Sequence, residues 1–174
     1  ALLADAVRIN GLSEVLEVVP RAVSSRAGKL RFSSDPKRVV AGRVLAADAP
    51  AEAIEIEATT IDLVADPAAQ LAFIKIDTEG HEPQVMAGGL ATLARIPAVL
   101  AVEFHLASMG STVAGERYPE FLLRRFKVWD IGNYAYPGRW APVPDGNVEA
   151  LGERARRDGN RLTDLLCIDK RLGE

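Results

Sequence analysis

The strongest constraint on the fold of this chain is a pair of apolar runs, Leu71 to Asp77 and Ala98 to His105. Runs with so little polar alternation are typical of strands in a parallel sheet that is covered on both faces. The segment between them carries an apolar stripe at helical spacing, formed by Met86, Leu90 and Leu93. A strand, a helix and a second strand in so short a stretch predict a right-handed βαβ unit, and therefore an α/β fold.

Both predicted strands end in ionisable side chains. The first leads into Asp77, Glu79 and His81, and the second closes with Glu103 and His105, so both histidines of the chain follow apolar runs. Neighbouring parallel strands bring their carboxyl ends to one rim, where open α/β sheets bind ligands. We therefore expect these five side chains to share a rim, although helix-capping acids and solvated charges would produce the same pattern.

Two kinds of chemistry fit these side chains. An imidazole titrates near neutral pH, which suits a general base. Two histidines with three carboxylates are also a donor set for a divalent metal, although their spacing matches no metal-binding signature. Lys75 lies in the middle of the first run, and the cost of burying its charge predicts an ion pair with Asp77 or Glu103 more than a catalytic role.

The remainder of the chain alternates short predicted helices and strands. Apolar spacing and stop signals predict helices at 1–9, from near Gly80 onward, and at 60–64, 120–126 and 149–158. Further strands are predicted at 15–19, with Ala22 and Val23 as an extension, and at 29–32, 54–59, 128–131 and 162–169. Polar or proline-rich composition predicts loops at 33–50, 107–119 and 137–147.

Length and composition limit the function classes. The 174 residues suffice for one domain with a hydrophobic core, so we expect a single domain over 1–174. The net charge of −3 gives no reason to expect nucleic acid or an anionic membrane as a partner. The single cysteine, Cys167, lies in an apolar run and indicates a buried thiol. Without a membrane-length apolar stretch or a signal-peptide pattern at 1–12, we expect a soluble, cytoplasmic protein.

The residues around the first long strand form a specific motif. The sequence reads FIKIDTEGHE over 73–82, and it continues with VMAGG at 85–89 and VLAVEFH at 99–105. This combination closely resembles the FkbM-type methyltransferase family. A weaker likeness runs upstream through NGL at 10–12, VVPRAVS at 18–24, GKLRF at 28–32 and ATTID at 58–62.

The resemblance implies a fold, a cofactor and a reaction. The family has the class I methyltransferase fold, a doubly wound, Rossmann-like sheet that is mostly parallel with an antiparallel last strand. Its members use S-adenosylmethionine, typically to methylate hydroxyl groups of sugars and other natural products. By this likeness Asp77 faces the methyl donor and the acceptor, and Ala22 and Val23 lie near the adenine. The catalytic group would then come from Asp77, Glu79, His81 and His105.

The sequence departs from the family in one respect. It contains no G-x-G and no predicted strand before Ala1, whereas the family carries a glycine-rich loop after its first strand. We therefore expect the carboxyl-terminal part of a methyltransferase, with weak binding of S-adenosylmethionine and with an open edge on the 71–77 strand through which the chain self-associates. The acceptor would be a small molecule or a carbohydrate. A metal-dependent hydrolase and a non-catalytic binding module are the alternatives.

Overall fold

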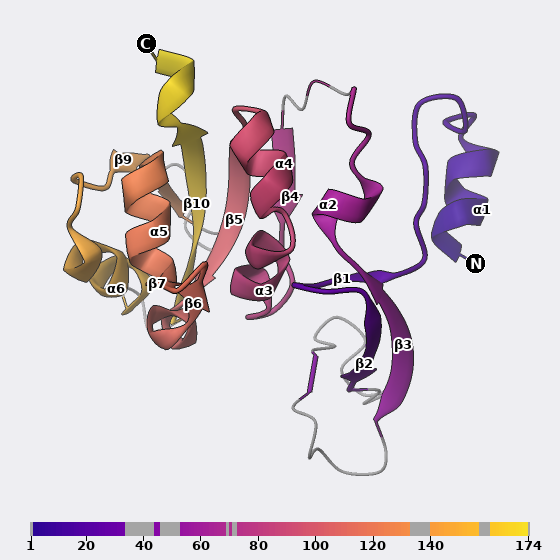
Figure 1. The fold of residues 1–174 in the computed structure, drawn as a ribbon, viewed down its shortest axis with the longest axis horizontal. Coiled ribbons are helices and arrows are strands. Elements are labelled where there is room, and N and C mark those ends of the chain that lie inside the picture. The colour runs from indigo at the N-terminus through magenta and orange to yellow at the C-terminus, as the bar shows by residue number, and fades with distance from the viewer. Residues whose placement is uncertain are drawn as a thin grey trace.

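The computed structural model describes residues 2–33, 44–45, 53–68, 70, 73–132, 140–156 and 161–173. Its α-helices are α1 (Leu2–Ile9), α2 (Ile61–Val64), α3 (Glu82–Ala87), α4 (Leu90–Arg95), α5 (Tyr118–Arg125) and α6 (Val148–Arg156). Its strands are β1 (Ala22–Val23), β2 (Gly28–Phe32), β3 (Ile54–Thr59), β4 (Phe73–Ile76), β5 (Val99–His105), β6 (Thr112–Val113), β7 (Glu116–Arg117), β8 (Phe126–Gly132), β9 (Ala141–Pro142) and β10 (Leu162–Asp169). Short 3-10 helices cover Leu106–Gly110 and Lys170–Gly173. Figure 1 shows two groups of strands, with β1 to β3 apart from the larger sheet that begins at β4.

The larger sheet has five strands in the order β4-β5-β10-β8-β9. Only β4 and β5 pair in parallel, as the predicted βαβ unit requires, and the other three pairings are antiparallel. The expectation of a mostly parallel sheet is therefore wrong, whereas that of an antiparallel last strand is confirmed. The physical reason is that β10 lies between β5 and β8 and is antiparallel to both strands, which makes two of the four pairings antiparallel.

One face of this sheet forms the hydrophobic core. Along β5 and β10 alternate side chains are buried, because helices α3, α5 and α6 pack against that face (Figure 1). Phe104 of β5 stacks on Tyr118 of α5 with ring centroids 6.0 Å apart, and both rings are fully buried. Cys167 is buried in the same core, as expected.

The strand β4 forms an edge of the five-stranded sheet. Among the described residues it pairs with β5 alone, in the register Phe73 to Val99 and Ile76 to Val102. Phe73 is 55% exposed in consequence. An edge strand with an open side, as predicted from the resemblance, is thus present in the described part of the chain.

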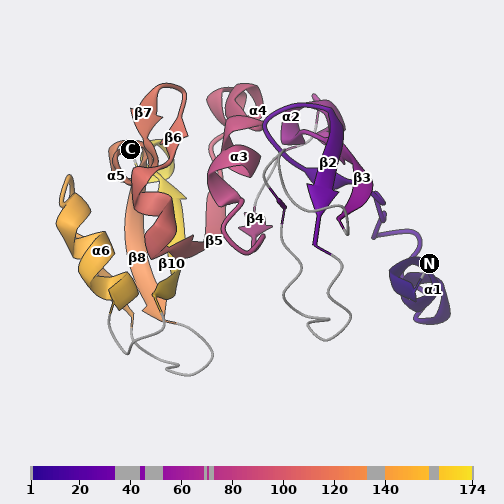
Figure 2. The ribbon, with the colours of Figure 1, turned by 90° about the horizontal axis from the view of Figure 1, so that it is seen from below.

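The first third of the chain forms a separate small sheet. In it β3 is central, with β1 parallel on one side and β2 antiparallel on the other. Figure 2, seen from below, places α1 at the far end of the molecule from α6. The predicted strand at 15–19 is wrong, because residues 16–20 have no regular structure and β1 begins only at Ala22.

The helix predicted to begin near Gly80 is divided into α3 and α4 at Gly88 and Gly89. A methyl group on Gly88 would overlap with the backbone carbonyl oxygen of Ser24, and one on Gly89 would lie 3.0 Å from Ile61. The carboxylate of Asp62 accepts hydrogen bonds from the first backbone N–H groups of α4, including that of Thr92 at 2.7 Å. The break therefore lets the small sheet and α2 approach the helices closely.

Other differences concern loops. The predicted loop at 107–119 contains a 3-10 turn and the β6–β7 hairpin, which turns at Ala114 and Gly115. Most of the predicted loop at 33–50 and part of that at 137–147 lie outside the described residues. In the described part of the chain, no helix has both the length and the hydropathy that crossing a membrane requires.

Candidate functional site

The parallel register of β4 and β5 sets the position of the candidate site. Ile76 lies opposite Val102, so both strands reach the same rim at nearly the same level. The residues that follow each strand must therefore meet there, as the sequence predicts. The five predicted side chains do gather at this rim, but four of them divide into two groups that face different surroundings, and Asp77 lies apart from both.

The turn after β4 has an unusual backbone. Glu79 has a φ of 56° and Gly80 a φ of 97°, both in the left-handed region that side chains other than glycine rarely adopt. The buried carboxylate of Glu82 holds this turn, because its Oε1 accepts hydrogen bonds from the backbone N–H groups of Thr78 and Gly80 and from the Thr78 hydroxyl, at 2.9 to 3.1 Å. Backbone strain of this kind clusters at functional sites.

Glu82 is the deepest ionisable group of the rim. It lies in the first turn of α3 and is fully buried. Its second oxygen, Oε2, has no hydrogen-bond partner among the described residues, and the same holds for the buried hydroxyl of Tyr118. Burial raises the pKa of Tyr118 well above its usual value, and the nearby charge of Glu82 adds to that effect. The buried carboxyl group of Glu82 thus lies directly behind the turn.

His81 forms the first group together with Ser24. The Nε2 atom of His81 lies 2.9 Å from the Ser24 hydroxyl oxygen, so the rim is joined to the segment that follows β1. Burial lowers the pKa of His81, an effect that the charge of Glu82 opposes only in part. The imidazole is therefore neutral at pH 7 and able to accept a proton.

Glu79, Glu103 and His105 form the second group, which we call the carboxylate–imidazole cluster. Their potential ligand atoms all lie within 4.8 Å of one another. His105 Nε2 is 2.6 Å from Glu103 Oε2, and this hydrogen bond raises the pKa of His105 against the effect of burial. Burial also raises the pKa of Glu79, and the charge of Glu103 adds to that effect. One imidazole and two carboxylates are a donor set for a divalent cation.

Asp77 belongs to neither group. It forms an ion pair with Lys75, as predicted, but the Lys75 side chain is 61% exposed, because it shares the exposed face of β4 with Phe73. The prediction of a buried lysine is therefore wrong. An exposed pair contributes about 0–1 kcal/mol to stability, so Asp77 is not required to balance a buried charge.

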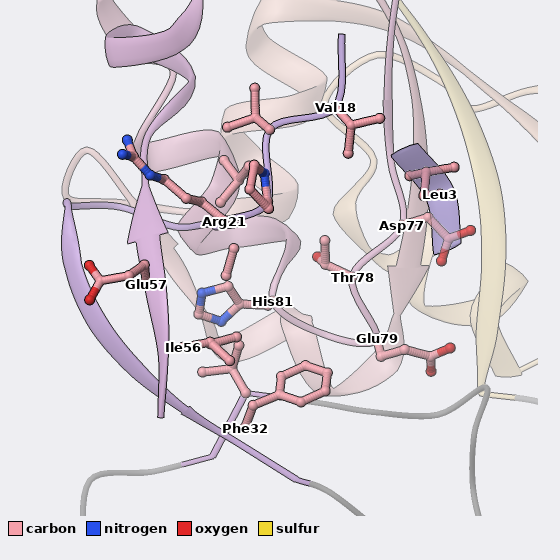
Figure 3. Close-up of a pocket in the computed structure, with 15 residues that line it drawn as sticks. Leu3, Val18, Arg21, Phe32, Ile56, Glu57, Asp77, Thr78, Glu79 and His81 are labelled. Atoms are coloured by element: carbon pink, nitrogen blue, oxygen red, sulfur yellow. The ribbon is translucent and has the colours of Figure 1, made fainter. Parts of the chain in front are cut away.

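A cavity of about 850 Å³ opens between this rim and the small sheet. Four of its lining residues, Asp77, Thr78, Glu79 and His81, come from the turn after β4. The opposite wall carries two charged side chains, Arg21 and Glu57, but is otherwise apolar, with Leu3, Val18, Val19, Pro20, Ala22, Val23, Phe32, Val44 and Ile56. Figure 3 shows Asp77 and Glu79 directing their carboxylates away from the His81 ring. His105 is not among the lining residues, so the cavity joins only part of the predicted rim to Ala22 and Val23.

Some residues of the site escape prediction from sequence. Ser24 is 57 residues from His81 and carries no local signal for that contact. Asp164 of β10 lies opposite Glu103 of β5. Burial raises the pKa of Asp164, and the charge of Glu103 adds to that effect. The position of Glu82 in a first helical turn suggests only a favourable surface acid, whereas the structure buries it.

Comparison with known protein families gives a match over most of the chain. The family model of the methyltransferase FkbM domain matches residues 4–126 of the 174. Neither the curated proteins nor the solved structures include a significant match. The matched range contains the small sheet, the βαβ unit and every residue that lines the cavity except Leu3.

Proposed function

Because the chain belongs to the FkbM methyltransferase domain family, we propose that it is an S-adenosylmethionine-dependent O-methyltransferase acting on a hydroxyl group of a sugar or another small molecule. The observation that carries the proposal is the cavity shared by Ala22, Val23 and Asp77, the three residues that the resemblance to the family assigns to the cofactor. Family membership favours this reaction over the alternative of a metal-dependent hydrolase.

The cavity fits this cofactor in size and in chemistry. Its volume of about 850 Å³ lies within the range of roughly 300–1,000 Å³ that is common for small-molecule sites. The apolar wall around Ala22 and Val23 suits an adenine ring, and the carboxylate of Asp77 suits a positively charged ligand group. When bound, the cofactor supplies an electrophilic methyl group.

The chain's own residues then have two tasks. Asp77 holds the positive end of the bound cofactor near the rim, and a base removes the proton of the acceptor hydroxyl. The hydroxyl proton of the acceptor passes to the base, and the bound cofactor would supply the methyl group that takes its place on the acceptor oxygen. His81 fits the second task because its imidazole lines the cavity and is neutral at pH 7.

The test is transfer of a labelled methyl group from S-adenosylmethionine to a panel of sugars and small alcohols. We expect Asp77→Asn and His81→Gln each to lower turnover on the order of 10²-fold, as for loss of a positioned charge or base. The matched control is Asp145→Asn. Asp145 also pairs with a lysine, Lys170, at an exposed place, but it does not line the cavity.

The melting temperature separates a catalytic from a structural role. Since the Lys75–Asp77 pair is exposed, Asp77→Asn is expected to change the free energy of unfolding by less than about 1 kcal/mol. Normal turnover in the Asp77→Asn variant would remove Asp77 from the reaction. Absence of methyl transfer to every acceptor, together with no effect of the cofactor on melting, would contradict the proposal.

A further inference from the structure

The carboxylate–imidazole cluster brings together side chains from two elements. Glu79 lies in the turn after β4, and Glu103 and His105 share one face at the end of β5. The parallel register of the two strands makes them meet, and all the ligand atoms lie within 4.8 Å of one another. We propose that Glu79, Glu103 and His105 bind a divalent cation.

The spacing of these atoms agrees with the size of a coordination sphere. Zinc, for example, lies about 2.0–2.2 Å from carboxylate oxygen and imidazole nitrogen ligands, so two ligands on opposite sides of the ion are about 4.2 Å apart. Three donors within 4.8 Å can therefore reach one ion after small side-chain rotations. Two carboxylates with one imidazole suit Mn²⁺ or Zn²⁺.

Burial distinguishes this cluster from ordinary surface acids. The side chains of His105 and Glu103 are only 19% and 14% exposed, so their positions are fixed by packing around β5. Glu79 is exposed and leaves an approach from solvent. Two donors are thus held in place, and the third completes the set from the open side.

The charges around the cluster also favour a cation. Fully buried Glu82 has one oxygen without a partner among the described residues, and its other oxygen accepts a hydrogen bond from Gly80, next to Glu79. Asp164 lies opposite Glu103 on β10 and adds another carboxylate. Lys75 on the neighbouring strand β4 pairs with Asp77. A bound divalent cation would offset this excess of negative charge.

The cluster adjoins the cavity, because Glu79 belongs to both. A cation held there would lie beside the acceptor and would polarise a hydroxyl group, which lowers the hydroxyl pKa. This consequence rests on the proposed methyltransferase function. Cation binding itself does not, and it is measured without cofactor or acceptor.

The experiment is titration of the protein with Mn²⁺, followed by calorimetry and by electron paramagnetic resonance, at an ionic strength that screens long-range charge. We expect one site per chain. Glu79→Gln should weaken Mn²⁺ binding by about 100-fold. Loss of a residue that is only hydrogen-bonded to a metal ligand can already have an effect of this size, and Glu79 is proposed as a ligand itself. His105→Gln should weaken Mn²⁺ binding similarly and should remove the nitrogen coupling from the resonance spectrum.

The matched control is Asp164→Asn, which removes a nearby carboxylate that is not part of the cluster. We expect that variant to weaken Mn²⁺ binding by less than about fivefold, as for a screened charge at longer range. Equal weakening by Asp164→Asn and Glu79→Gln would overturn the proposal and show general attraction to an acidic rim. Binding without nitrogen coupling, or no binding to the folded wild type, would also overturn it. Methyl transfer unaffected by chelation would reject only the catalytic consequence.

Discussion

The two parts of this chain bury their apolar side chains very differently. The hydrophobic core cluster runs from Ile76 to Cys167 and lies wholly in the part that begins at β4. Before that part, only Val7 and Ala58 are buried apolar residues among those described. Ten of the thirteen exposed large apolar side chains also lie before residue 70. One wall of the cavity is therefore built on a close-packed core, and the other is not.

This difference assigns separate roles to the two walls. The turn from Asp77 to His81 is fixed by β4, α3 and the buried Glu82, so it can hold reacting groups in place. The wall around Ala22 and Val23 is attached through the Ser24–His81 contact, the packing of Gly88 and the partly buried side chain of Val23, which packs against the core. Regions with few buried apolar contacts open at low free-energy cost. We expect the second wall to adapt to a ligand and the first to stay rigid.

The largest expected effect comes from the core of the second part. Phe104→Ala removes a fully buried ring that stacks on Tyr118, and it should lower the free energy of unfolding by about 3–5 kcal/mol. Phe73→Ala on the neighbouring edge strand is the control and should cost far less. Urea denaturation measures both. Equal losses would show that β4 is covered in solution.

A smaller effect is expected at a buried carboxylate near the end of β10. Asp169 is almost fully buried and pairs with Arg125 and Arg171 at 3.0 and 2.9 Å. Asp169→Asn should lower the free energy of unfolding by about 2–3 kcal/mol, less than for a wholly buried pair because the arginines are partly exposed. Thermal denaturation checks this, with Asp145→Asn at an exposed pair as the control.

The same residue gives a pH dependence with a definite sign. Burial alone would raise the pKa of Asp169, but hydrogen bonds from Arg171 and the charge of Arg125 outweigh it and hold the pKa below its usual value. Its stabilising contribution is therefore complete above the unfolded pKa of about 3.9 and is lost as pH falls through the lower, folded pKa. The free energy of unfolding of the Asp169→Asn variant should therefore fall less over that acidic pH range than that of the wild type. Parallel acid-unfolding curves would contradict this.

A still smaller effect is expected where the two parts meet. Gly88→Ala places a methyl group against the carbonyl oxygen of Ser24 and should cost about 1–3 kcal/mol. It should also make residues before 70 more sensitive to limited proteolysis than the rest. Gly110→Ala, which meets open space, is the control. Unchanged proteolysis in Gly88→Ala would show that other contacts hold the parts together.

The smallest effect is expected on the surface of the first part. Ile9 is 74% exposed, so Ile9→Ser should change the free energy of unfolding by less than about 0.5 kcal/mol. Denaturation at several protein concentrations provides the measurement. A larger loss that depends on concentration would show that a second copy of the chain covers these apolar side chains, and the comparison of the two parts would then need revision.

Sequence patterns predict what local chemistry determines. The βαβ unit and its shared rim follow from apolar spacing within one stretch, and the ion pair of Lys75 and Asp77 follows from two positions on one strand. The exposure of Lys75 does not follow, because it depends on which face of β4 the distant helices cover. The break at Gly88 and the Ser24–His81 contact depend on approaches between distant segments, which leave no periodic signal.

The place of β10 in the sheet has a consequence for synthesis of the protein. β10 follows β5 and β8 in sequence but lies between them, and its buried residues include Leu165 and Cys167 of the core. During translation β5 and β8 cannot complete the sheet, and their apolar surface stays exposed, until residues 162–169 leave the ribosome. Chains that emerge in part are prone to aggregation in this interval. Slow decoding late in the message would therefore lower the yield of folded protein more than slow decoding early in it.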